Sequence, residues 1–165
     1  MTIEAPGLPS LSLEHAFDVT IWFDKRWQFG PIPGGGNQGY TSVKWGSIEG
    51  PMLNGKVVEQ SGADWANVRT DGVIELNAHY IFEVDDGTRI YIRNQGYVHR
   101  PLRARGQGPD EEPSIPGYFR CTPYFRAPEG PHDWLNRTVI VGSGVRRPGT
   151  DTVPDHSLFR YWAVR

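Results

Sequence analysis

Cysteine is nearly absent from this sequence, which holds one, Cys121, among 165 residues. A single thiol excludes an internal disulfide and any metal site built from several cysteines, and it fits a reducing compartment. We expect Cys121 to be a small buried residue and not a nucleophile. Packing must therefore hold the fold together, and a chain of this length buries about two thirds of its unfolded surface as one domain.

An excess of charge of one sign is also lacking, because 17 Lys and Arg are balanced by 19 Asp and Glu. A chain without a basic field is not expected to bind nucleic acid or anionic lipid through charge alone. The first residues lack the apolar core of a secretory signal, and no run approaches the roughly 18 apolar residues that span a membrane. We predict a cytoplasmic protein with neither a nucleic-acid nor a membrane partner.

The common motifs for cofactors, metals and covalent catalysis are missing as well. Gly34–Gly36 is followed by no Lys-Ser or Lys-Thr pair. We therefore interpret the loop predicted over 24–39 as a flap over a cavity mouth and not as a phosphate-binding loop. No GxSxG sequence is present, and the five histidines lack the spacing of a zinc site. These observations predict a protein without a cofactor or a metal.

Turn-forming and aromatic residues are abundant, with 20 Gly, 14 Pro and 12% aromatic residues. This composition favours many short strands over helices. Alternating runs predict strands over 15–22, 40–46, 55–59, 73–84, 89–93, 118–125, 134–141 and 157–164, with a long polar loop over 99–117. About eight antiparallel strands in meander order indicate an all-β fold, a single closed up-and-down β-barrel. We assign the barrel domain to residues 11–165, after a flexible leader at 1–10.

The clearest local prediction is a hairpin within residues 61–97, with its turn at Asp85-Asp86-Gly87. Glycine at the third turn position supplies the positive φ that a tight hairpin needs. Before the turn, even positions from Ile74 to Val84 are apolar, while most odd positions are polar, and the same alternation follows the turn. In a barrel one of these faces must line the interior. The sequence leaves open which face it is.

Three residues in this stretch are the candidate acid/base groups. Asp64 stands beside Trp65, where an indole wall would raise the carboxyl pKa by desolvation; the alternative is a turn-capping aspartate. His79 lies mid-strand, and in an enclosed barrel it would titrate near neutral pH, although a structural histidine fits equally well. Tyr91 lies opposite or diagonal to His79 across the predicted hairpin, within reach of the same ligand.

Other side chains are candidates for binding a substrate. Arg69 is better explained as the partner of Asp71 in an ion pair than as an anion-binding group. Arginines are candidates for a carboxylate or phenolate, and aromatic residues for the lining of a pocket, although surface arginines and ordinary packing are the alternatives. The full candidate set is Trp45, Trp65, Arg69, Arg93, Tyr118, Arg120, Tyr124 and Trp134.

A set of short motifs resembles the domain-of-unknown-function 3237 family. These are Gly62-Ala63-Asp64-Trp65, Arg69, Asp71-Gly72, Leu76–Tyr80, Asp85-Asp86-Gly87, Tyr118-Phe119-Arg120, Pro123, Phe125, Trp134-Leu135-Asn136 and Val141–Gly144. The resemblance covers roughly residues 11–164 and implies a small closed barrel of lipocalin-like shape, often a homodimer, with no settled activity. Asn77 and His79 replace an Asp and an Arg that are usual in that family, which would make His79 a local specialisation.

Our leading functional hypothesis is a cofactor-independent enzyme. It would bind a small aromatic or polyketide-like molecule in the barrel and catalyse proton transfer as an isomerase, cyclase or lyase, with Asp64, His79 and Tyr91 at the reacting centre. A non-catalytic carrier or sensor of the same ligand is the first alternative. A structural dimerisation module with a filled core is the second.

Overall fold

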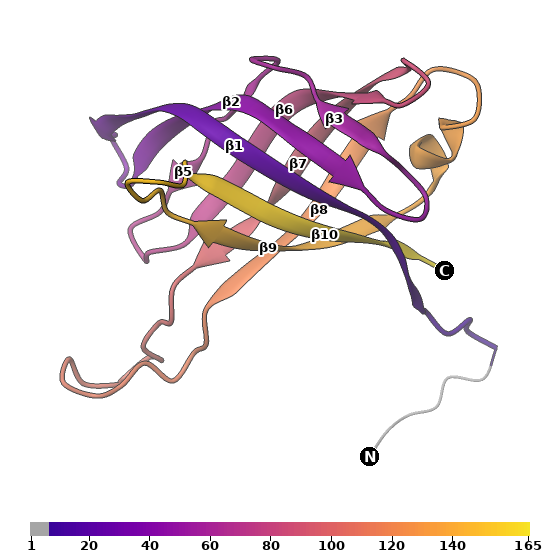
Figure 1. Cartoon of the computed structure of the whole chain (residues 1–165). Coiled ribbons are helices and arrows are strands. Elements are labelled where there is room, and N and C mark those ends of the chain that lie inside the picture. The colour runs from indigo at the N-terminus through magenta and orange to yellow at the C-terminus, as the bar shows by residue number, and fades with distance from the viewer. Residues whose placement is uncertain (1–6) are drawn as a thin grey trace.

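Antiparallel strands form almost all of the regular structure in the computed structural model, which describes residues 7–165 (Figure 1). The strands are β1 (Leu13–Pro31), β2 (Asn37–Glu49), β3 (Gly55–Val57), β4 (Ala63–Asp64), β5 (Asn67–Val68), β6 (Ile74–Val84), β7 (Arg89–His99), β8 (Tyr118–Arg126), β9 (Ile140–Arg147) and β10 (His156–Val164), with a 3₁₀ turn, η1, at Asp133–Arg137.

Hydrogen bonds between the strands run in a ring. The order is β1-β10-β9-β8-β7-β6-β3-β2, and β2 pairs back onto β1, while the short strands β4 and β5 each bridge β2 and β6. Figure 1 shows β1, β2 and β10 in front of β6, β7 and β8. The predicted all-β, antiparallel meander is therefore confirmed, and its ring-like pairing gives the chain an inner and an outer surface.

The β6–β7 hairpin forms where the alternation predicted it. Phe82 pairs with Ile90 and Glu83 with Arg89 across the turn, and Gly87 takes a φ of 86°. Residues of the even face are buried, since Tyr80 is 2% exposed and Phe82 fully buried. The even, apolar face therefore lines the interior, and the odd face points outward.

Aromatic side chains fill one part of this interior. The rings of Phe17, Phe82 and Phe125 meet edge to face or tilted, with centroids 6.0 to 6.2 Å apart. Such contacts add to the free energy of burying the rings. Cys121 is buried at the edge of the same core, as expected. This packed core stabilises the strands that also enclose the hollow part of the barrel.

Two predicted segments have a different structure. Residues 24–39 are not a loop, because β1 continues to Pro31 and β2 begins at Asn37, leaving a turn at 32–36. Register shifts between Trp22 and Arg26 interrupt the two-residue period that signals a strand. The predicted strand over 134–141 begins only at Ile140, because the preceding residues form η1.

Smaller differences have local causes. Asp64, for which a turn-capping role was the alternative, lies in the short strand β4, which pairs with β2 on one side and β6 on the other. Pro123 lies inside β8, in a part that pairs with β7 and not with β9, so its missing N–H faces an unpaired edge. The long polar loop after β7 is confirmed, with one bridge between Leu102 and Ile115.

The predicted leader at 1–10 falls partly on residues 1–6, which lie outside the described residues. In the described part of the chain, residues 7–10 precede β1 and belong to no strand. No helix within residues 7–165 is long and apolar enough to cross a bilayer.

Candidate functional site

A cavity of about 930 Å³ occupies the hollow part of the barrel. Its lining includes residues of β1 and β2, the start of β6 and the segments after β7 and β9, and most of its wall is apolar. Ile21, Val43, Ile74, Leu76, Phe119 and Phe159 contribute aliphatic and aromatic surface. A space of this size and character is typical of a binding site for a small molecule.

Asp64 reaches this cavity because β4 is wedged between two longer strands. The residue pairs with Thr41 of β2 and with Ala78 of β6, and all three line the cavity. The close approach requires Gly62, because a Cβ there would lie 1.7 Å from the carbonyl oxygen of His79. Glycine at this position therefore allows the chain to bring an acidic side chain into the wall.

The environment of the Asp64 carboxylate shifts its affinity for protons. Burial in the cavity wall raises the pKa of Asp64 to about 6. A hydrogen bond from the Asn77 N–H to Oδ1 (3.0 Å) and the charge of Arg26 both lower this pKa, but the effect of burial is larger. The residue is only partly exposed, and what remains open faces the cavity. A carboxyl group with this pKa exchanges its proton near neutral pH, as a general acid or base must.

A cluster of charged side chains forms part of the cavity wall. Asp155 Oδ2 accepts hydrogen bonds from Arg26 (Nη2, 3.1 Å) and from Arg146 Nη2, and the Arg146 guanidinium lies 4.2 Å from the centre of the Phe23 ring. All four residues line the cavity. Two guanidinium groups share one carboxylate, so the cluster carries one net positive charge, and the charge of Arg26 acts on Asp64.

Two buried polar groups of the cavity wall lie on the inward face of β6 and β7. Asn94 is 1% exposed and donates from Nδ2 to the Tyr161 hydroxyl (2.9 Å), but its Oδ1 has no hydrogen-bond partner among residues 7–165. The Tyr80 hydroxyl is equally buried and also lacks a partner within those residues. Burial raises the pKa of Tyr80 above its usual range, so the hydroxyl is protonated. Buried groups without partners cost about 1–3 kcal/mol each.

The other two predicted catalytic residues lie outside the barrel. His79 and Tyr91 are on the outward face of the hairpin, where the His79 Nδ1 and the Tyr91 hydroxyl are 2.6 Å apart. The prediction that the two side chains meet across the hairpin is confirmed, but neither lines the cavity that Asp64 faces. Desolvation, followed by the charge of Arg93, lowers the pKa of His79.

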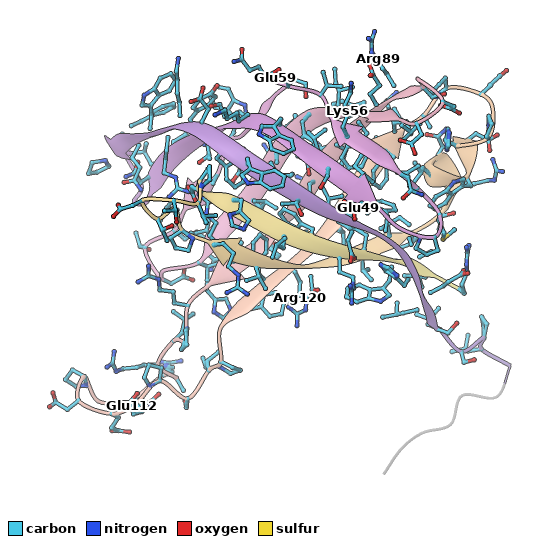
Figure 2. All side chains as sticks on the ribbon, in the orientation of Figure 1. Glu49, Lys56, Glu59, Arg89, Glu112 and Arg120 are labelled. Carbon is cyan, nitrogen blue, oxygen red and sulfur yellow. The ribbon has the colours of Figure 1, made fainter. Side chains whose placement is uncertain are left out.

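Most predicted binding residues also face outward. Arg69 pairs with Asp71 and Glu75, as its ion-pair interpretation expected, and Arg93 donates to the side chain of Asn77. Arg120, labelled in Figure 2, is exposed and lies near the Tyr118 ring. Within residues 7–165 the cavity wall includes Asp64 and none of the eight predicted binding residues, Trp45, Trp65, Arg69, Arg93, Tyr118, Arg120, Tyr124 and Trp134.

The aromatic members of that set pack elsewhere. Trp45 stacks on Trp22 with centroids 4.1 Å apart, and Trp134 lies in η1 against the core. Tyr124 is 53% exposed. Trp65 is closest to a role in the site, since its ring meets Tyr40, a lining residue, edge to face at 4.7 Å.

Comparison with known proteins places the chain in a family. Residues 11–164 match the model described as Protein of unknown function (DUF3237). The chain belongs to this family. Among curated relatives, UPF0311 proteins of Rhodopseudomonas palustris TIE-1 and Clostridium acetobutylicum are each 30% identical, over 91% and 98% of this chain and 98% and 99% of their own lengths.

Solved structures of similar proteins share the fold of this DUF3237 chain. A β-barrel-like protein from Acinetobacter baumannii is 25% identical with a TM-score of 0.80, over 97% of this chain and 99% of its own. An enzyme from Penicillium herquei has a TM-score of 0.68 over 96% of this chain and 98% of its own, at 18% identity. At that identity the likeness shows the fold alone.

Several site residues of this DUF3237 chain were not among the predicted ones. Asn94 could have been recognised from the sequence. It follows Ile90 and Ile92 at the same two-residue spacing, so it is a polar residue at a position predicted to face inward. Arg26 and Asp155 carry none, since 129 positions separate them and the barrel alone brings them together.

Proposed function

We propose that this protein binds a small, largely apolar, ring-bearing molecule in its cavity and catalyses a cofactor-independent proton transfer, with Asp64 as the acid/base group. The observation that carries the proposal is a carboxyl group in the cavity wall whose pKa is raised to about 6. Perturbed titratable groups in clefts are a recurring feature of active sites. His79 and Tyr91 have no part in this proposal, because they lie on the other side of the sheet.

The proposed reaction consists of proton transfers between Asp64 and the substrate, with no oxidation or reduction. Asp64, as carboxylate, takes a proton from a carbon next to a substrate carbonyl, and the electron pair of the broken C–H bond moves into an enolate. The positive charge of the Arg26, Asp155 and Arg146 cluster stabilises this anion. The protonated Asp64 then returns the proton to another substrate atom, which gives an isomerisation, a cyclisation or the loss of a leaving group.

The experiment is a turnover screen of aromatic ketones, enols and phenolic ethers, guided by native mass spectrometry of freshly purified protein for a retained ligand. Asp64→Asn keeps an acceptor for the Asn77 N–H but removes the base, so we expect kcat/KM to fall at least about 100-fold. In the wild type, kcat/KM should drop as the pH falls below about 6. His79→Gln is the matched control and should leave kcat/KM within about twofold; Asp64→Asn with unchanged turnover would sink the proposal.

A non-catalytic carrier is the second candidate, favoured by the unpartnered polar atoms of Tyr80 and Asn94, which suit ligand recognition without chemistry. Binding without turnover across the whole panel would decide for the carrier. The filled-core dimerisation module conflicts with the cavity of about 930 Å³. A homodimer remains a prediction, and the same native mass spectra would report it.

A further inference from the structure

Three residues of the cavity wall carry a buried polar atom without a hydrogen-bond partner among residues 7–165. One atom is Asp155 Oδ1, whose carboxylate already binds two arginines through Oδ2, and the other two lie side by side on β6 and β7. Asn94 Oδ1 and the Tyr80 hydroxyl both lack a hydrogen-bond partner within residues 7–165, while their side chains are 1% and 2% exposed and line the cavity. Buried polar groups in native proteins are almost always satisfied by protein, water or ligand. Their position therefore points to a partner that enters through the cavity.

The strand register places the Asn94 and Tyr80 side chains next to each other, so one ligand group can reach both. Asn94 pairs with Ala78, and Tyr80 pairs with Ile92, so the two side chains are diagonal neighbours on one inward face. Tyr161, from β10 on the other side of the ring, holds the Asn94 amide through its 2.9 Å hydrogen bond. In this arrangement Nδ2 is the donor to Tyr161, and Oδ1 is left as an acceptor.

The chemistry of the pair selects among possible ligand groups. A ligand atom that satisfies both must donate to the Asn94 oxygen and accept from the Tyr80 hydroxyl. A hydroxyl group does both. An ionised carboxylate or phosphate has no proton to donate, and its negative charge would lie against the acceptor oxygen of Asn94. The guanidinium groups of Arg26 and Arg146, which could neutralise such a charge, are bound to Asp155.

We infer that Tyr80 and Asn94 form a hydroxyl-recognition subsite, and that the molecule bound in the cavity carries a phenolic or enolic hydroxyl on its ring. This inference rests on the proposed cavity function and adds the group by which the ligand is recognised. With the hydroxyl at this subsite, the rest of the ring lies along the apolar wall, next to Asp64.

The test compares probes that differ in the hydroxyl alone. We would measure Kd by equilibrium dialysis for 1-naphthol, 1-methoxynaphthalene and naphthalene, whose ring suits the apolar wall. The wild type should bind 1-naphthol about tenfold more tightly than naphthalene, which corresponds to about 1.4 kcal/mol. 1-Methoxynaphthalene cannot donate a hydrogen bond and should bind no better than naphthalene.

Two variants locate this preference. Asn94→Leu keeps the shape of the side chain, and Tyr80→Phe removes only a hydroxyl, so at least one variant should retain the fold, which circular dichroism and the melting temperature would verify. Each should bring 1-naphthol to within about threefold of naphthalene while leaving the naphthalene Kd unchanged. Tyr91→Phe removes a hydroxyl from the outer face and should keep the full preference.

The outcomes separate the two proposals. Equal binding of 1-naphthol and naphthalene by the wild type, or a preference that survives in the folded variants, overturns the subsite and leaves the Asp64 chemistry standing. Failure of all three probes to bind overturns the subsite together with the cavity function. Normal hydroxyl preference combined with unchanged turnover in Asp64→Asn supports the subsite and rejects the proposed catalysis.

Discussion

The two faces of the β6–β7 hairpin carry polar groups in opposite situations. On the outer face, the imidazole of His79 lies 2.6 Å from the Tyr91 hydroxyl, and both residues are partly exposed. On the inner face, Tyr80 and Asn94 are buried and keep polar atoms without partners among residues 7–165. Residue type alone therefore does not mark a functional group. The face on which it lies decides whether water and neighbours, or a ligand, complete its hydrogen bonds.

The largest difference in stability between the inner and outer faces should come from a substitution in the packed core. Phe82→Ala removes a fully buried ring that contacts Phe17 and Phe125, and we expect it to lower the free energy of unfolding by about 3–5 kcal/mol. Ile81→Ala, one residue earlier on the partly exposed outer face, should cost about 1 kcal/mol. Urea unfolding followed by fluorescence measures both. Equal losses would mean that the two faces are not inside and outside.

A smaller effect, with a distinctive pH dependence, should come from Asp64. Its pKa is raised by burial from 3.8 to about 6, so the folded state holds a proton that the unfolded state loses. Stability therefore falls as the pH rises from about 4 to about 6, and above this range the charged carboxylate costs about 3 kcal/mol. Asp64→Asn should relieve most of this cost at pH 8 and change little at pH 4, as urea unfolding at the two pH values would show.

Asp86, in the hairpin turn, provides a control of opposite sign. Hydrogen bonds from Thr88, and then the contact with His132, lower the pKa of this exposed carboxyl to about 2. Its contribution to stability is present above about pH 4 and is lost as the pH falls toward 2. Asp86→Asn should therefore destabilise the protein at pH 8, where Asp64→Asn stabilises it. Stabilisation by both, or by neither, would contradict the difference in environment.

The same contrast explains how far the sequence could lead. The hairpin, its turn and its two faces follow from local rules, because Gly87 and the alternation around it act within a few residues. Asp64 was a candidate because a local pattern placed it beside Trp65. Sequence reasoning did not single out Tyr80 and Asn94, because they carry the few polar groups on an otherwise apolar face, where packing is the ordinary explanation.

The bulged end of β1 and the contacts between distant residues could not be predicted from local sequence patterns. The bulges that carry β1 through residues 24–31 disturb the period by which strands are recognised. Arg26, Arg146 and Asp155 meet because β1, β9 and the segment before β10 adjoin in the ring. A charged cluster assembled by ring closure is a property of topology, and no local pattern records it.

The smallest effect, and the sharpest check on the comparison, should come from Tyr91→Phe. The substitution removes the hydroxyl that contacts His79 on a partly exposed surface, where water replaces the lost partner, so we expect the free energy of unfolding to change by less than about 1 kcal/mol. The Kd for 1-naphthol should stay within about twofold of the wild type, because the whole sheet separates Tyr91 from the cavity. Tyr80→Phe removes the same group from the inner face and should weaken 1-naphthol binding at least about threefold. A comparable loss of affinity in Tyr91→Phe would show that the outer pair contributes to the site, and the distinction between the two faces would fail.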